Sequence, residues 1–234
     1  MLDYYYDKAK YDYEICIDEV GRGCMFGDVV VSSTILPKTC NFDISNIKDS
    51  KKFTSKKKLI IESENIKLNV LHHHTSFMSN KVVDEINILQ AVMQGMRECI
   101  KHSVEFIESM AAKTCKSVDY DRILLLIDGN YFTPYVHTNG ITLNYETVKQ
   151  GDGKYVGIAA ASIVAKSTRD AAVSKLCEEY PLLSEYYNLD SNVGYGSKRH
   201  IDGIKEHGIT TMHRKTFGIC KTSKINDVLC DNIV

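Results

Sequence analysis

Two short runs of mostly hydrophobic, β-branched residues near the N-terminus predict two strands. The first run covers residues 13–18 and the second covers residues 29–36, and Gly21, Gly23 and Gly27 lie in the connection between them. A connection this short favours an antiparallel hairpin over a parallel crossover. We therefore expect the chain to begin with two neighbouring antiparallel strands.

Apolar residues at helical spacing predict helices further along the chain. Thr54 or Ser55 can serve as the N-cap of a short helix with a very basic first turn. A long amphipathic helix is expected from Ser79 onward. An alanine-rich segment predicts a tightly packed helix that ends at Pro181.

Three more strands complete the predicted set. Residues 68–77 and 141–148 are strand-like, and the continuous apolar run at 122–127 is typical of a parallel strand buried on both faces. Strands that alternate with helices in this order predict a mixed α/β domain. We place that domain in residues 1–180 and expect residues 181–234 to form an extension packed on it as one structural unit.

The charge balance limits how a polyanion could bind. Lysine and arginine number 29 against 30 acidic residues, so the formal net charge of -1 supplies no global field that would attract a nucleic acid. Such a partner would have to be held by local basic patches.

The cysteines and the apolar segments indicate the compartment. The eight cysteines form no CxxC pair, which fits free thiols in a reducing compartment. The N-terminus has no signal-peptide pattern, and no apolar run approaches the roughly 20 residues that span a bilayer. We expect an intracellular protein that is neither secreted nor inserted in a membrane.

Four carboxylates lie where predicted elements end or begin. Asp18 and Glu19 follow a hydrophobic strand, Asp128 closes an apolar strand, and Asp152 precedes the alanine-rich helix. A carboxylate at the end of a buried strand is costly unless it is paired, hydrogen-bonded or bound to a metal. Taken singly, Asp18 with Glu19 is better interpreted as opening a solvated turn and Asp152 as capping the helix, whereas Asp128 could equally form a turn before Gly129. The residues alone leave both interpretations open.

If the four carboxylates converge, they suit a hard cation. No histidine and cysteine pattern accompanies them, which favours Mg²⁺ or Mn²⁺ over zinc. Two such ions about 3.5 to 4 Å apart can activate a water and stabilise the leaving oxygen of a phosphodiester. Spacing alone does not establish convergence, because the acids are spread over more than half the chain.

Seven sequence blocks resemble the ribonuclease HII family and follow its order from about residue 13 to about residue 219. One such block would be weak evidence, whereas seven in series are specific. The blocks are IDEVGRG at 17–23, DSKK at 49–52, INILQA at 86–91, LIDGN at 126–130, QGDGK with IAAASIVAKSTRD at 150–170, GYGS at 194–197 and MHRKTF at 212–217.

The resemblance implies a fold and a metal site. The family fold is a ribonuclease H-like mixed five-stranded sheet flanked by helices, here with a C-terminal helical extension. The resemblance identifies Mg²⁺ or Mn²⁺ as the cofactor, with Asp18 and Asp128 on neighbouring central strands. The residues that match the family's metal-binding, catalytic carboxylates are Asp18, Glu19, Asp128 and Asp152.

The resemblance also implies how substrate is bound. Gly21, Arg22 and Gly23 match a loop whose backbone contacts the ribose 2′-hydroxyls that mark RNA, and glycine lets a main chain approach a sugar closely. Tyr195 matches a tyrosine that packs on the deoxyribose after the ribonucleotide. The simpler alternative for Tyr195 is an aromatic side chain in a surface turn.

Lysines in and after the DSKK block are candidates for phosphate contacts. The resemblance implies that Lys51 or Lys52 contacts phosphate. The lysines at 56–58 could extend that patch or could simply form a solvated helix start.

The chain departs from the family pattern at three places. Residues 24–28 replace the proline and the later Gly-Pro step that commonly follow GRG, and the lysine that usually precedes Gly151 is shifted to Lys149. The tail, residues 221–234, has no aromatic residue and hence no glutamine-and-aromatic motif for a sliding clamp. We expect a monomer without a clamp tether.

The activity implied by the resemblance is endonucleolytic. The expected substrates are RNA/DNA hybrids and duplex DNA with embedded ribonucleotides, cut by a two-metal-ion mechanism that leaves a 3′-hydroxyl and a 5′-phosphate. One alternative is a nucleic-acid-binding protein of the same fold with weak or no catalysis. Another is a different carboxylate metallohydrolase, which would have no need of GRG with a downstream GYGS.

Three consecutive histidines, His72, His73 and His74, do not predict a metal site. Consecutive side chains of an extended segment point to opposite faces, so all three cannot meet one ion. We expect solvated strand residues.

Two further pairs of residues have simple interpretations. Arg169 and Asp170 are expected on the helix surface or behind the metal ligands, without direct metal contact. His213 and Arg214 could touch substrate or pack the extension, and the sequence leaves both open.

Overall fold

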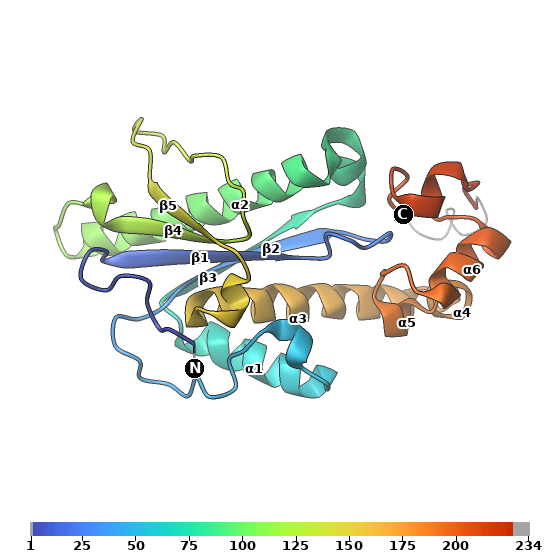
Figure 1. Ribbon diagram of the computed structural model, residues 1–234, viewed down its shortest axis with the longest axis horizontal. Helices are drawn as coiled ribbons and strands as arrows, with labels where there is room; N and C mark the ends of the chain where they lie inside the picture. The colour runs from blue at the N-terminus through green and yellow to red at the C-terminus, as the bar shows by residue number, and fades with distance from the viewer. Residues whose placement is uncertain (1, 227–234) are drawn as a thin grey trace. The chain divides into compact units, whose positions relative to one another are not determined.

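A mixed five-stranded sheet with helices on both sides is the main feature of the fold (Figure 1). The structure, a computed structural model, describes residues 2–226. The strands run in the order β3-β2-β1-β4-β5, which confirms the predicted mixed sheet. They are β1 (Tyr13–Val20), β2 (Val29–Ile35), β3 (His72–Met78), β4 (Ile123–Asp128) and β5 (Asn144–Val148).

The middle strand β1 is the point where the sheet changes direction. It pairs antiparallel with β2, as in Cys16 opposite Thr34, and parallel with β4, as in Ile17 opposite Ile127. The predicted hairpin and the predicted central parallel strand are both confirmed. The apolar residues of β1 and β4 are almost completely buried, and each such side chain stabilises the fold by about 1.5–3 kcal/mol.

Helices connect and cover the strands, and short 3₁₀ segments lie between them. The side chain of Ser55 accepts a hydrogen bond from the Lys58 amide, so the predicted N-cap of the first helix is confirmed. The helices are α1 (Lys56–Asn69), α2 (Asn80–Lys113), α3 (Val156–Glu179), α4 (Leu182–Tyr187), α5 (Leu189–Asn192) and α6 (Lys198–His207), and the 3₁₀ segments are η1 (Ser50–Lys52), η2 (Tyr120–Arg122), η3 (Gly151–Gly153) and η4 (Gly218–Thr222).

Helix α2 is interrupted, which the helical spacing of its apolar residues did not predict. Asn87 has φ 66° and ψ 163°, outside the helical region. Its side-chain oxygen accepts hydrogen bonds from the amides of Leu89 and Gln90 at 3.0 and 3.1 Å. Asn87 therefore caps a second helical segment, and the predicted long helix is two helices joined at a kink.

Two helices contact opposite faces of the sheet. On one face, the Thr34 hydroxyl of β2 donates to the Gly157 carbonyl of α3 at 2.9 Å. On the other, the Ser33 hydroxyl lies 2.9 Å from the Ser103 hydroxyl of α2. Because neighbouring strand residues point to opposite faces, these two contacts place α3 and the later part of α2 on different sides (Figure 1).

All three histidines of β3 are half-buried, and the prediction of solvated side chains is wrong for His72 and His74, which pack on aromatic rings. The His72 ring stacks on Phe106 with a centroid distance of 4.7 Å, and His74 stacks on His102 at 4.0 Å. Burial lowers the pKa of His72 to about 4. These aromatic partners lie on α2, far away in sequence.

The chain forms two compact units, each built from several segments. The first comprises Met1–Val20, Val30–Ser76 and Met93–Ser167, and the second comprises the remaining segments Gly21–Val29, Phe77–Val92 and Thr168–Val234. The division predicted at residue 180 stays a prediction. The helices α4 to α6 belong to the second unit, whose buried core includes Phe26, Tyr187 and Ile204.

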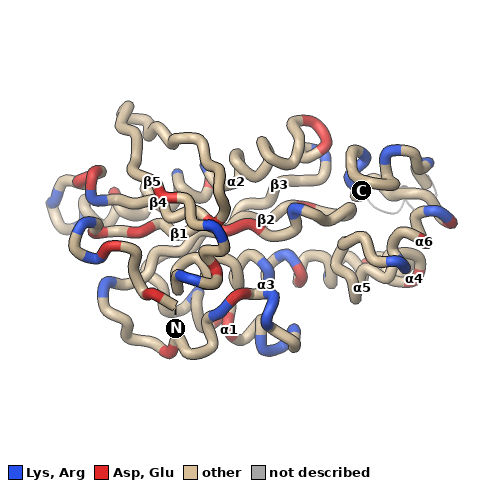
Figure 2. Tube along the Cα trace, viewed as in Figure 1, with Lys and Arg blue, Asp and Glu red and all other residues tan. Residues whose placement is uncertain are grey.

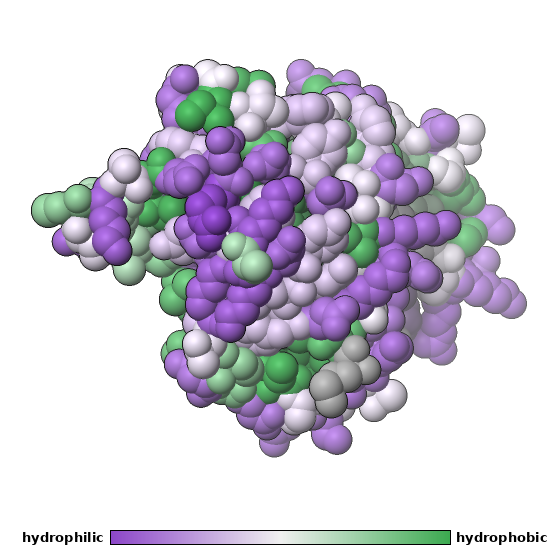
Figure 3. Space-filling model, turned by 60° about the vertical axis from the view of Figure 1, so that its left-hand side comes forward, coloured by the Kyte–Doolittle hydropathy of each residue, from purple (hydrophilic) through white to green (hydrophobic). Residues whose placement is uncertain are grey.

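The surface is mostly polar. Figure 3 shows a face on which hydrophilic residues predominate and hydrophobic ones form small separate areas. Scattered exposed apolar side chains, such as Ile61 and Leu68 on α1, are ordinary for a folded chain. In the described part of the chain, no helix has the length and apolar character needed to cross a membrane.

Candidate active site

Asp18 and Asp128 lie side by side on neighbouring strands of the first unit. The parallel register pairs Ile17 with Ile127, and each acid is the next residue along its strand. Asp18 also accepts a hydrogen bond from the side chain of Ser162 on α3, which places its carboxylate on the face that α3 covers. Figure 2 shows acidic segments in red on these strands. The structure thus brings together two carboxylates that are 110 residues apart in the sequence.

Asp18 is a buried carboxylate with like charges beside it. Only 5% of its surface is exposed. Burial, followed by the charges of Glu19 and Asp128, raises the pKa of the Asp18 carboxyl well above its usual value. Hydrogen bonds from the Ser162 side chain and from the Glu19 amide, at 2.7 Å, act in the opposite direction. A nearby cation would stabilise the ionised form.

The segment after β5 positions Asp128 and Asp152. The amide of Gly151 donates to Asp128 Oδ1 at 2.6 Å, and Asp152 follows in η3 with 9% of its surface exposed. Asp152 does not cap α3, because it lies four residues before that helix begins at Val156. Burial and then the charges of Asp49 and Asp128 raise the pKa of Asp152.

Asp49 joins this group although the sequence analysis did not single it out. Its side chain is hydrogen-bonded to Asp152 and also accepts from the Lys51 amide at 2.9 Å, which caps η1. The signal was present in the DSKK block, where only the lysines were considered. The next residue, Ser50, has its hydroxyl 2.9 Å from that of Ser162, so η1 is also tied to the helix residue that binds Asp18.

Glu19 is half-buried and follows Asp18 on β1. Because consecutive strand residues point to opposite faces, its side chain leaves the backbone on the other face of the sheet. Its charge still contributes to the raised pKa of Asp18. Electrostatic contacts therefore connect all four predicted carboxylates in the order Glu19, Asp18, Asp128, Asp152.

This group of acids fits a hard cation in part. Across residues 2–226, no cluster of three or more histidine, cysteine, aspartate or glutamate side chains could by itself hold a metal ion. Mg²⁺ does not require such a cage, because it commonly keeps several waters and takes only one or two carboxylates together with substrate phosphates. The all-oxygen, buried and mutually repelling donor set has the chemistry that such an ion prefers.

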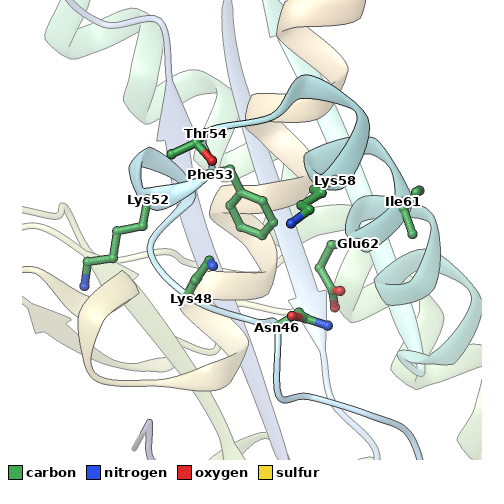
Figure 4. A pocket seen from close by; sticks show the side chains of 8 residues that line it. All are labelled: Asn46, Lys48, Lys52, Phe53, Thr54, Lys58, Ile61 and Glu62. Carbon is green, nitrogen blue, oxygen red and sulfur yellow. The ribbon is translucent and has the colours of Figure 1, made fainter.

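Basic residues gather beside η1, in the same unit. Lys51 and Lys52 are both exposed. A pocket of about 280 Å³ adjoins η1. Its three lysines, Lys48, Lys52 and Lys58, form no ion pair within the described residues. The pocket is lined by Asn46, Lys48, Lys52, Phe53, Thr54, Lys58, Ile61 and Glu62 (Figure 4).

Positively charged lysine side chains lie near the Phe53 ring. The Lys48 ammonium lies 4.9 Å from the ring centroid, a cation–π distance. Figure 4 shows Lys58 beside the same ring, whereas Lys52 extends away from it. The pocket is therefore a cationic surface with an aromatic centre and a single carboxylate, Glu62.

The second unit contains the other predicted substrate-binding residues. Gly21 has φ +88° and is buried, whereas Arg22 and Gly23 are exposed. Tyr195 has 43% of its surface exposed, and burial of the remainder raises the pKa of its hydroxyl to about 12. Of the residues predicted to touch sugar, Arg22, Gly23 and Tyr195 thus present accessible groups, whereas Gly21 is covered.

The position of Arg169 in the second unit differs from one prediction, and the positions of His213 and Arg214 decide between two alternatives that the sequence left open. Arg169 does not lie on the helix surface, since only 1% of it is exposed. His213 and Arg214 are completely buried, so they pack the C-terminal region. The His213 ring contacts Phe26 and Tyr187 edge to face, at centroid distances of 5.1 and 4.8 Å.

Comparison with known proteins identifies relatives across most of the chain. A family model described as ribonuclease HII matches residues 15–220. The chain is 36% identical to a ribonuclease HII of Cytophaga hutchinsonii over 204 residues, which cover 87% of this chain and 88% of the relative. It is 40% identical to a ribonuclease HII of Parabacteroides distasonis over 204 residues, covering 86% and 87%.

Solved structures share the fold. Ribonuclease H2 from Pyrococcus horikoshii OT3 matches with a TM-score of 0.63 at 18% identity, covering 89% of this chain and 95% of that one. Ribonuclease HII of Archaeoglobus fulgidus, solved in a complex with PCNA, matches with a TM-score of 0.59 at 22% identity, covering 88% and 95%. Bst ribonuclease HIII in complex with Mn²⁺ matches at 0.55 and 14%, covering 86% and 71%.

The fold is therefore ribonuclease H-like, as predicted. Because the family match spans nearly all of the described residues and the sequence relatives cover most of both chains, the chain belongs to the ribonuclease HII family and is a metal-dependent ribonuclease H, an endonuclease that acts on RNA in hybrids.

Proposed function

We propose that this ribonuclease H cuts both the RNA strand of RNA/DNA hybrids and single ribonucleotides embedded in duplex DNA, and that it leaves a 3′-hydroxyl and a 5′-phosphate. The observation that supports it most is the pairing of Asp18 and Asp128 on adjacent strands, within one electrostatic group that includes Glu19 and Asp152.

The four carboxylates Asp18, Glu19, Asp128 and Asp152 would hold two divalent cations, Mg²⁺ or Mn²⁺. Bound there, the ions would activate the attacking water and stabilise the leaving oxygen of the phosphodiester. No histidine is available among these residues to act as a general base, so the carboxylates carry the site's chemistry through the ions they bind.

Neighbouring groups would keep the acids in position. The Ser162 side chain and the Glu19 amide hold Asp18 by hydrogen bonds, and the Gly151 amide holds Asp128 through its Oδ1. Asp49 would orient Asp152 in the same way. Such supporting hydrogen bonds fix the direction of metal-binding carboxylates.

Substrate recognition would come from two sets of residues. The backbone at Gly21, Arg22 and Gly23 would contact the 2′-hydroxyls of the ribonucleotide, and the exposed Tyr195 would pack on the following deoxyribose. This combination would let the enzyme read a step from RNA to DNA.

Phosphate contacts would come from the lysines near η1. Lys51 and Lys52 would bind backbone phosphates, and the pocket lysines Lys48 and Lys58 would extend the contact. Since the whole chain has almost no net charge, affinity for a polyanion depends on such local groups.

We propose a monomer without a sliding-clamp tether, and most of the tail that this concerns, residues 227–234, lies outside the described residues. None of the described cysteines forms a disulfide, which is consistent with a reducing intracellular compartment.

The test is cleavage of labelled duplexes by the purified protein. One duplex contains a single ribonucleotide, a second is an RNA/DNA hybrid and a third is all DNA, each with Mg²⁺ or Mn²⁺. We expect metal-dependent cleavage of the first two only, and product ends distinguishable by ligation and phosphatase treatment.

Two variants make this test specific. Asp128→Asn should abolish cleavage, whereas Asp121→Asn, an exposed acid just before the start of β4, should retain it. Undiminished cleavage by Asp128→Asn would overturn the assignment of the site. Binding of the duplexes without turnover by the wild type would instead indicate a catalytically inactive binding protein of this fold.

A further inference from the structure

A buried arginine connects two segments of the second unit that the proposed function uses. We call Gly21–Asp28 the recognition loop and 193–196 the tyrosine turn. Arg169 donates from Nε to the Asp28 carbonyl at 3.0 Å and from Nη2 to the Phe26 carbonyl at 3.0 Å. Its Nη1 donates to the Val193 carbonyl at 2.7 Å. One guanidinium thus binds both segments.

A second buried arginine binds the recognition loop from the C-terminal region. Arg214 donates from Nε to the Gly27 carbonyl at 2.9 Å and from Nη1 to the Arg22 carbonyl at 3.1 Å. Its amide donates to the Met25 carbonyl at 2.8 Å. Arginine side chains therefore donate to four carbonyls of the recognition loop, those of Arg22, Phe26, Gly27 and Asp28.

Direct contacts also join the recognition loop to the tyrosine turn. The Met25 amide donates to the Gly194 carbonyl at 2.8 Å. The Cys24 thiol is hydrogen-bonded to the Tyr195 side chain and lies 3.8 Å from the Val193 carbonyl. Cys24 stands where the family commonly has proline, so this chain has a thiol contact at that position.

Two glycines leave room for this arrangement. A Cβ on Gly21 would lie 2.2 Å from Arg169 Nε, and a Cβ on Gly194 would lie 2.8 Å from the Phe26 carbonyl oxygen. Both residues have positive φ, +88° and +91°. Gly21, the first glycine of the GRG block, is thus needed to accommodate Arg169 as well as for any approach to a sugar.

The two guanidinium groups are expensive to bury, which argues that they do more than fill space. Arg214 is completely buried, and burial together with the nearby Arg169 charge lowers its pKa to about 10. Its Nη2 is buried and makes no hydrogen bond within the described residues. An apolar side chain would avoid both costs but would leave the loop carbonyls without donors.

We propose that Arg169 and Arg214 are positioning residues for substrate specificity. They fix the distance between the exposed backbone around Arg22 and the ring of Tyr195. If the loop reads the ribose and the tyrosine reads the next deoxyribose, as the proposed function states, this distance sets how strictly the enzyme requires an RNA-to-DNA step. The inference rests on that function and deepens it.

The test compares two substrates in one variant. Arg169→Lys keeps the charge but replaces three fixed donors by a single flexible ammonium. We expect kcat/KM for the duplex with a single ribonucleotide to fall roughly ten-fold more than kcat/KM for the long hybrid, because a small misplacement of a binding group is costly where two contacts must be met together. Arg122→Lys, which weakens an exposed bidentate contact with Asp12, is the matched control and should leave the ratio unchanged.

A purely structural role gives a different result. It would lower the melting temperature and reduce both rates equally, and that outcome would overturn the inference. Arg214→Lys should shift the ratio in the same direction as Arg169→Lys. Failure of both variants to fold would also count against the inference, since a role in stability alone predicts it.

A third variant connects the effect to the tyrosine. In a Tyr195→Ala background the preference for the RNA-to-DNA step should already be lost, so adding Arg169→Lys should not change the ratio further. Independent, additive effects would contradict the inference. Cleavage by the wild type with an unchanged ratio in the arginine variants would refute this inference alone, whereas no cleavage by the wild type would refute the proposed function and this inference with it.

Discussion

The tightest part of the carboxylate group is the turn at Gly151, and adding one methyl group there tests the geometry. A Cβ on Gly151 would lie 2.5 Å from Ile158 Cδ1 and 3.2 Å from Asp128 Oδ1. Ile158 is completely buried, so it cannot move into solvent. Gly151→Ala must therefore shift the turn, and with it the amide that donates to Asp128.

The magnitude follows from two opposing contributions. Overpacking of a buried site costs about 1–3 kcal/mol. Replacing glycine by alanine at an unstrained position gains about 0.4–1 kcal/mol, because the unfolded chain loses freedom. The same replacement at Gly153, where a Cβ meets nothing within 4 Å, reports the gain alone. We expect Gly151→Ala to be less stable than Gly153→Ala by about 1–3 kcal/mol.

Urea denaturation of both variants, together with cleavage of the RNA/DNA hybrid, measures the effect. Displacement of Asp128 should reduce kcat/KM of Gly151→Ala by at least about ten-fold, because catalytic groups tolerate little misplacement. Gly153→Ala should keep wild-type activity. If the two variants are equally stable and equally active, Gly151 does not position Asp128 and the reasoning is refuted.

Three further changes have defined outcomes. Ser162→Ala removes a hydrogen bond to the buried Asp18 carboxylate, worth about 1.5–3 kcal/mol, and should lower kcat/KM about 10- to 150-fold. Ser167→Ala on the same helix should change kcat/KM less than about two-fold, and equal effects of the two variants would contradict the role of Ser162. Lys58→Gln should reduce the slope of log KM against log salt concentration by about 0.9 if the lysine contacts one phosphate, with Lys67→Gln, a lysine paired with Glu64, as the control that should not. Burial lowers the pKa of His213 to about 3, so below about pH 6.5 the unfolded chain takes up a proton at this residue that the folded protein excludes. The contribution of His213 to stability is therefore present above pH 6.5 and is lost as the pH falls, by about 1 kcal/mol from pH 7 to pH 5.5. Urea denaturation of His213→Gln should show a pH dependence that is smaller by that amount.

The sheet and the main carboxylates could be predicted because their signals are local. A continuous apolar run ending in an acid marked β4 and Asp128, and the short glycine connection marked the hairpin that begins with β1. The convergence of the acids was different in kind, since it depends on the register between β1 and β4. Only the family resemblance supplied that step.

Other features depend on partners that sequence spacing does not reveal. The apolar spacing of α2 continues through Asn87, yet a side-chain cap outweighs helical propensity there. The three consecutive histidines of β3 predict solvated strand residues, yet His72 and His74 stack on aromatic rings of α2. Each difference is a tertiary contact that overrides a local pattern.

The buried arginines show what sequence information could still have been used. The recognition loop contains Met25 and Phe26, apolar residues that are buried although they lie outside any strand or helix. A buried irregular segment leaves several carbonyls without backbone donors, so donors must come from elsewhere in the chain. Arginine supplies five N–H groups in a fixed fork, more than any other side chain. An arginine in an alanine-rich helix, such as Arg169, is therefore better interpreted as the partner of such a loop than as a surface charge.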